Sequence, residues 1–195
     1  ISHLGFCVLA IVSFNGAGIA GSTLHMVNHA LSTGALFLTV GLLTRRYASS
    51  QISDYSGVWS KLPGLTFFML IFSLASVGLP GLNNFVSEMM MLAGLADMRN
   101  QHVLGLWFLV IAAFGIFLSA WYTLTVVRRV FFGPLKEPLA NGIVTDLTGR
   151  ERLILVPLAA TCLLLGLFPR PVTFLIDTDA QRLALIAEEA RVRGQ

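Results

Sequence analysis

Apolar residues in this sequence gather in long runs that are separated by short polar or glycine-rich stretches. The longest runs have about the length, roughly 20 residues, that a helix needs to cross the hydrocarbon core of a bilayer. In chain order, the runs are residues 1–14, 23–43, 62–79, 85–96, 103–127 and 153–168. This pattern predicts an all-α integral membrane protein, a polytopic bundle of transmembrane helices.

Polar residues mark the connections between these runs. We predict a glycine-rich loop at 15–21, a polar loop at 47–61 and the longest connection at 131–152. Residues 177–193 are charged but keep apolar residues at helical spacing, so we expect a helix that lies on the membrane surface. Arginines close more than one of the apolar runs, and the positive-inside rule therefore gives no clear orientation.

The composition agrees with a membrane location and narrows the range of partners. Hydrophobic residues make up 55% of the chain and charged residues 12%, about half the charged share of a soluble domain. The mean hydropathy is +0.78. The net charge of +3 comes from scattered Lys and Arg, without a basic block, so we expect the lipid bilayer and no nucleic acid as a partner. Cys7 and Cys162 lie far apart in apolar runs, which favours neither a disulfide framework nor a metal cluster.

The run 62–79 ends in a sequence that cannot easily continue as a helix. Pro80 lacks a backbone N–H and is flanked by Gly78 and Gly81, so we expect the helix to break near Pro80. A break at membrane depth needs protein or a water-filled cavity to satisfy its backbone, and broken helices mark ion sites in transporters. An ordinary turn between two separate spans is the alternative.

Glu88 follows the break and is the only acidic residue inside any of the apolar runs. A charged residue at the centre of a span costs about 2.5–3.5 kcal/mol on insertion scales. A carboxyl group removed from water favours its neutral form, which carries a proton that it can later release. We therefore predict that Glu88 transfers protons, with structural pairing as the alternative.

Two histidines form a second candidate site. His25 and His29 are four residues apart, so they share one helix face. A zinc peptidase site of the HExxH type would need an intervening glutamate, which is absent. A haem site would need a second pair, which His3 and His102 do not form. A proton relay and a structural role as hydrogen-bonded core histidines stay open, and the relay is favoured because polar residues on one face of a span indicate a hydrated interior.

Several stretches occur in the same order as the landmarks of a known family. They are SHLGF, HMVNHALSTGALFLTVG, LASVGLPGLNNFVSE, VVRRVFFG and TDLTGRERLILVPLAATCLLLGLFPRPV. Together they resemble the antiporter-like membrane subunits of respiratory complex I, and most closely the M-type subunit. The resemblance implies a fold of two inverted repeats, each with a broken helix. It places residues 1–176 in the C-terminal part of the proton-translocating transmembrane domain, with the N-terminal half missing, and leaves 177–195 as a polar tail.

The resemblance also implies roles for the candidate residues. M-type subunits have glutamate at the position of Glu88, where the related subunits and cation/proton antiporters usually have lysine. His25 and His29 fall on the central hydrophilic axis of the family. The implied function is that of a proton-translocating subunit of NADH-quinone oxidoreductase in the bacterial cytoplasmic membrane, coupled to quinone reduction elsewhere in the complex.

Further expectations concern cofactors and partners. Nothing in the sequence suggests a nucleophile, a phosphate loop or a dinucleotide fold, so we expect no redox active site and no cofactor on this chain. The resemblance implies that NADH, FMN, iron–sulfur clusters and quinone bind to other subunits, and that neighbouring antiporter-like subunits are the partners. A subunit of a cation/proton antiporter or of a membrane-bound hydrogenase with the same fold is the alternative.

Overall fold

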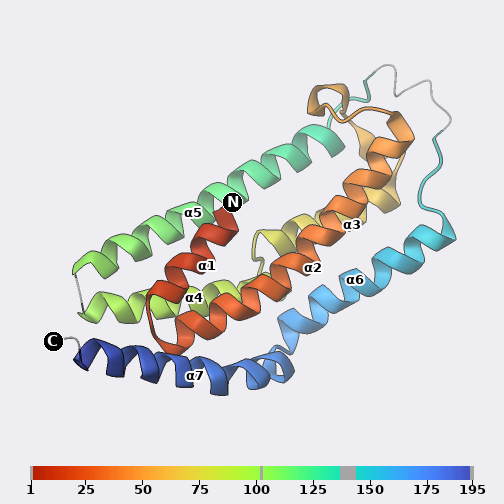
Figure 1. The fold of residues 1–195 in the computed structure, drawn as a ribbon. Helices are drawn as coiled ribbons and strands as arrows, with labels where there is room; N and C mark the ends of the chain where they lie inside the picture. The colour runs from red at the N-terminus through yellow and green to blue at the C-terminus, as the bar shows by residue number, and fades with distance from the viewer. Residues whose placement is uncertain (1, 102, 137–143, 194–195) are drawn as a thin grey trace.

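The computed structural model describes residues 2–101, 103–136 and 144–193, which are helical apart from turns and short connections. The α-helices are α1 (Ser2–Val12), α2 (Gly16–Tyr47), α3 (Pro63–Ser76), α4 (Asn83–Gln101), α5 (Val103–Phe131), α6 (Gly149–Leu167) and α7 (Arg170–Arg193), and two 3-10 helices, η1 (Ile52–Asp54) and η2 (Val58–Ser60), lie between α2 and α3. No strand occurs in these ranges. The predicted all-α class is therefore confirmed, and Figure 1 shows the helices packed as a bundle.

Length and hydropathy set α2 and α5 apart as helices that can cross a membrane. The pair α6 and α7 meets the same test if it is taken as one span, although the two helices are bent by 61° at their junction. The helices α1 and α3 are apolar but shorter. Many large apolar side chains on the outside of the bundle are exposed, among them Phe37, Trp107 and Phe114, as expected where a helix faces lipid.

The glycine-rich segment 15–21, predicted to be a loop, is instead the start of α2. Asn15 caps the helix, because its side-chain oxygen accepts a hydrogen bond of 2.8 Å from the Gly18 N–H. The glycines allow close packing, since a Cβ added at Gly21 would lie 2.8 Å from the Met90 Cβ, and one at Gly94 would lie 2.6 Å from the Gly18 Cα. Small residues serve this purpose in membrane helices, so the glycine cluster indicates a helix contact.

The helix breaks between Ser76 and Asn83, as predicted. Gly78 and Gly81 have φ angles of +72° and +94°, in the left-handed region that glycine enters at little cost. The two halves pack one after the other along α2, with α3 against its C-terminal part and α4 against its N-terminal part. On the α3 side Thr39 contacts Met69, and on the α4 side the Asn15 amide donates to the Gly94 carbonyl over 2.7 Å. The break therefore lies within one broken helix, and the ordinary turn between two spans is excluded.

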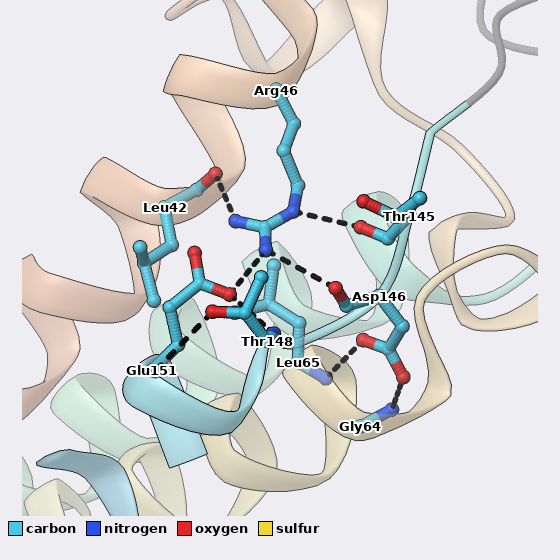
Figure 2. Close-up of polar contacts among 8 residues, drawn as sticks. All are labelled: Leu42, Arg46, Gly64, Leu65, Thr145, Asp146, Thr148 and Glu151. Atoms are coloured by element: carbon cyan, nitrogen blue, oxygen red, sulfur yellow. Dashed lines mark hydrogen bonds and ion pairs between the residues drawn. The ribbon is translucent and has the colours of Figure 1, made fainter. Parts of the chain in front are cut away.

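A group of polar contacts ties α2, α3 and α6 together at one end of the bundle (Figure 2). The Asp146 carboxylate accepts hydrogen bonds from the Gly64 and Leu65 N–H groups, at 2.7 and 3.1 Å, and so caps the N-terminus of α3. Arg46 on α2 forms an ion pair of 2.6 Å with Glu151 on α6. Arg46 also donates to the carbonyl groups of Leu42, Thr145 and Asp146. These contacts fix where the broken helix begins.

The C-terminal helix is longer than predicted. It starts at Arg170 and continues without interruption to Arg193, so the predicted domain boundary between residues 176 and 177 falls inside α7. The helix contacts the start of α2, where Gln181 lies beside Gly16. Leu183, Leu185 and Ile186 are more than half exposed. The location of this helix on the membrane surface stays a prediction.

Candidate functional site

Glu88 lies in α4, shortly after the break, and is 3% exposed. Its carboxylate packs directly against Gly78, where an added Cβ would overlap the carboxylate oxygens. The helix break and the Glu88 carboxylate are therefore in direct contact. The positive φ of Gly78 and the missing side chain together make room for Glu88. Of the three residues predicted to break the helix, Gly78, Pro80 and Gly81, Gly78 is the one that contacts the carboxylate.

The Glu88 carboxylate accepts no hydrogen bond from any residue within the described ranges. It borders a cavity of about 400 Å³ that lies between α1, α3, α4 and α5. The polar side chains around this cavity are those of Ser2, His3, Ser76, Glu88 and Ser119, and the other lining residues are apolar or glycine. A site of about 10–15 Å³ with polar partners suffices for one water molecule, so the cavity has room for several water molecules between Glu88 and the other polar groups.

The two predicted histidines are joined by a third. His25 is fully buried, and its Nε2 lies 3.4 Å from Nδ1 of His3. The ring of His29 has its centroid 4.5 Å from that of His3 and 5.8 Å from that of His25. From the sequence, His3 was considered only as one half of a second haem pair with His102, and it is 22 residues away from His25 along the chain. The packing of α1 against α2 brings the three rings together, which the sequence interpretation did not predict.

Hydroxyl groups extend this cluster at both ends. His25 Nδ1 lies 3.0 Å from the Ser87 Oγ, and His3 Nε2 lies 3.3 Å from the Ser119 Oγ. The Ser119 hydroxyl also donates to the Tyr122 hydroxyl over 3.1 Å. The result is a continuous hydrogen-bonded string from α4 through α2 and α1 to α5. Ser119 was missed by the sequence interpretation, although a serine within the apolar run 103–127 is the kind of signal that could have identified it.

An asparagine pair holds the start of α4 against α2. The Asn28 amide donates to the Asn83 carbonyl over 2.7 Å, and the Asn83 amide donates to the Asn28 carbonyl over 2.9 Å. Beside this pair, the Asn84 amide donates to the Ser32 hydroxyl over 3.1 Å. All four side chains are buried. These bonds fix the start of α4 against α2, and one of them gives the Asn83 carbonyl beside the break a protein partner.

Comparison with known proteins gives this arrangement a context. A family model described as "NADH:quinone oxidoreductase/Mrp antiporter, TM" matches residues 1–124, which include the cluster, the break and Glu88. The chain belongs to this family. The predicted resemblance to the antiporter-like membrane subunits is therefore confirmed.

Individual relatives in the family agree with this assignment. The chain is 40% identical over 180 residues to NADH-quinone oxidoreductase subunit M of Mycobacterium tuberculosis, covering 91% of this chain and 31% of the relative. It is 36% identical over 184 residues to the subunit M of Rhodobacter capsulatus, covering 94% and 34%. The chain thus spans about a third of the length of the relatives it matches.

Solved structures of the family share the fold. A chain of the respiratory complex I from Thermus thermophilus with bound NADH superposes with a TM-score of 0.84 at 30% identity, covering 93% of this chain and 37% of that one. A chain of the Mrp complex from Dietzia sp. DQ12-45-1b superposes with a TM-score of 0.76 at 17% identity, covering 93% and 41%. At this lower identity the second similarity shows the fold alone.

Proposed function

We propose that this chain translocates protons as part of a membrane subunit of an NADH-quinone oxidoreductase, with Glu88 as a proton carrier. The observation that carries the proposal is the placement of Glu88. The carboxylate is buried, lacks a protein hydrogen-bond partner in the described ranges, and borders the same cavity as His3. A charged group in such a place is costly, and an ionisable residue inside a membrane bundle points to a proton relay.

The proposed proton path runs from the histidine cluster to Glu88. A neutral imidazole has one donor and one acceptor nitrogen, so it can receive a proton on one side and release one on the other. The 3.4 Å distance between His25 and His3 allows transfer between their rings. Water in the cavity then completes the path from His3 to Glu88. Ser87 and Ser119 keep the outer nitrogens in place through hydroxyl groups that both donate and accept.

The relatives support the finer parts of the proposal. Proteins of the same family are named as subunit M of NADH-quinone oxidoreductases in bacteria, and we place this chain in the bacterial cytoplasmic membrane beside other antiporter-like subunits. NADH, FMN, iron–sulfur clusters and quinone then bind to other subunits. Moving one proton against 100 mV takes about 2.3 kcal/mol, which the electron transfer in those subunits provides.

A second candidate function is that of a subunit in a cation/proton antiporter. The fold similarity to the Mrp complex favours it. Glu88 distinguishes the two candidates, because the resemblance described above associates glutamate at this position with the M-type subunit. A subunit M relative is 40% identical, whereas the Mrp chain is 17% identical, so the oxidoreductase is the better supported of the two.

The direct test is Glu88→Gln in the complete subunit, assembled in its complex. Glutamine keeps the shape of the side chain but cannot titrate, and loss of a positioned proton carrier costs at least about a hundredfold in the step it serves. We expect NADH-driven proton uptake into vesicles, normalised to assembled complex, to fall to a small fraction of its normal value. Glu189→Gln, on the exposed face of α7, is the matched control and should pump normally. Normal pumping by Glu88→Gln would contradict the proposal.

A further inference from the structure

We propose that His3, His25 and His29 form a binding site for a divalent transition-metal ion, and that Zn²⁺ is the ion that suits it. One ring nitrogen from each histidine can be chosen so that all three lie within 4.8 Å of one another. From the sequence, zinc binding by the pair on α2 was considered only as a site of the HExxH type and set aside because the intervening glutamate is absent. The third ligand comes from α1 and becomes apparent only when the helices are packed.

The distances agree with those of a zinc site. Zn–N bonds of about 2.0–2.1 Å at a tetrahedral angle hold two ligand nitrogens about 3.3–3.4 Å apart. His25 Nε2 and His3 Nδ1 are already 3.4 Å apart. His29 stands next to both rings and contacts Thr33, with its Nδ1 3.1 Å from the hydroxyl. Its Nε2 also lies 3.3 Å from that hydroxyl, so the proposed site requires His29 to rotate away from Thr33 and bring one nitrogen, now within 4.8 Å of the other two, to binding distance.

The groups around the pair also fit a metal site. Histidines that bind a metal almost always use their second ring nitrogen in a hydrogen bond that fixes the orientation of the ring. His25 bonds to Ser87 and His3 bonds to Ser119 through the nitrogens that do not face each other. The hydroxyl oxygens can accept a hydrogen bond from each imidazole N–H. Both rings are therefore oriented with their second nitrogens facing each other, where the two nitrogens can share an ion.

The ligand chemistry determines the class of ion. Neutral imidazoles favour Zn²⁺, Cu²⁺ and Ni²⁺, whereas Mg²⁺ and Ca²⁺ prefer oxygen ligands. Three histidines leave a fourth position open in a tetrahedral site. His3 borders the cavity of about 400 Å³ that Glu88 also borders, so water in this cavity can occupy that position. The Glu88 carboxylate supplies the nearby negative charge that a buried cation needs.

Binding of the ion has a consequence for proton transfer. The nitrogen lone pairs that bind Zn²⁺ are the same ones that accept protons, so a cluster loaded with Zn²⁺ cannot relay them. Zn²⁺ therefore acts as a reversible block of the histidine path. This consequence rests on the proposed function, whereas the binding itself does not.

The binding is tested with Co²⁺ as a spectroscopic substitute for Zn²⁺ on the purified full-length subunit. We expect one Co²⁺ per subunit with the intense visible absorption of a four-coordinate site, displaced by Zn²⁺. His3→Gln and His25→Gln should each weaken binding by at least about a hundredfold, and Ser87→Ala by about tenfold. Cys162→Ala removes a buried thiol that lies outside the cluster, and it should bind Co²⁺ like the unmodified chain. A weak six-coordinate spectrum, or unchanged affinity in His25→Gln, would overturn the proposal.

The block is tested separately in vesicles that contain the whole complex. Zn²⁺ should inhibit proton uptake over the same concentration range in which it displaces Co²⁺, and Ser87→Ala should shift both curves together by about tenfold. Displacement of Co²⁺ at normal proton uptake would overturn the block and the histidine relay, while the metal site would stand.

Discussion

At the scale of single residues, the proposed proton path is defined by buried polar contacts. The Glu88 carboxylate borders the cavity, whereas the histidines contact one another and two serines. One end of the proposed path therefore depends on water in the cavity, and the other on contacts between protein side chains.

Glu88→Lys is a prediction at this scale. Lysine also carries an exchangeable proton, and the family resemblance places lysine here in the related subunits. We expect Glu88→Lys to retain several times more NADH-driven proton uptake than Glu88→Gln when both are normalised to assembled complex. Equal loss in both variants would mean that the negative charge, rather than the proton, is what the site requires.

Ser119→Ala tests the link between α5 and the histidines. Loss of one hydrogen bond of this type costs about 0.5–1.5 kcal/mol, so we expect proton uptake to fall about threefold to tenfold. Thr125 lies on the same helix but bonds to the carbonyl of Trp121, and Thr125→Ala is the matched control with normal uptake. If both variants pump normally, Ser119 does not orient His3.

At the scale of elements, the broken helix is specified by two glycines with different surroundings. Both have positive φ angles. Gly78 lies against Glu88, whereas a Cβ added at Gly81 would meet no heavy atom within 4 Å. Substitutions at the two positions therefore distinguish the effect of backbone strain from the effect of filling the space beside the carboxylate.

Gly78→Ala and Gly81→Ala form a matched pair of variants. Each places alanine at a positive φ, at a cost of about 1–3 kcal/mol. This strain should lower the free energy of unfolding of the purified subunit by a similar amount in both variants. Gly78→Ala must in addition displace the Glu88 carboxylate, and we expect it alone to lower proton uptake per assembled complex, by at least about tenfold. Equal uptake by the two variants would show that the position of Glu88 is not set by Gly78.

At the scale of the whole molecule, the contacts of Arg46, Asp146 and Glu151 join segments that are far apart in sequence (Figure 2). Asp146 reaches α3 from a segment that follows α5, and Arg46 connects α2 with α6. The end of the broken helix is therefore anchored by the rest of the bundle.

Asp146→Asn is the prediction that belongs to this scale. The amide replaces one of the two acceptor oxygens of the cap with a donor, and loss of a helix cap costs about 0.5–2 kcal/mol. We expect the purified subunit to unfold at a lower temperature, by a few degrees. Asp179→Asn, in an exposed pair with Arg182, should leave the melting temperature nearly unchanged. A normal melting temperature for Asp146→Asn would mean that the cap does not stabilise α3.

The sequence by itself determined the class of the protein and its most unusual side chain. Apolar runs of about 20 residues have the length of membrane-spanning helices, which satisfy all their backbone hydrogen bonds internally, and Pro80 between two glycines favours a helix break. Glu88 stood out because the energetic cost of an acidic group in an apolar run is independent of the details of packing. These features are local, and local sequence is sufficient for them.

The tertiary structure decided everything that depends on which helices are neighbours. His3 joined His25 and His29 only because α1 packs on α2, and Ser119 reached His3 only because α5 packs beside α1. The segment 15–21 was expected to form a loop, but in the bundle Gly18 and Gly21 let α2 approach α4 closely. A sequence lists which side chains are present, whereas the distances between helices result from the packing of all of them at once.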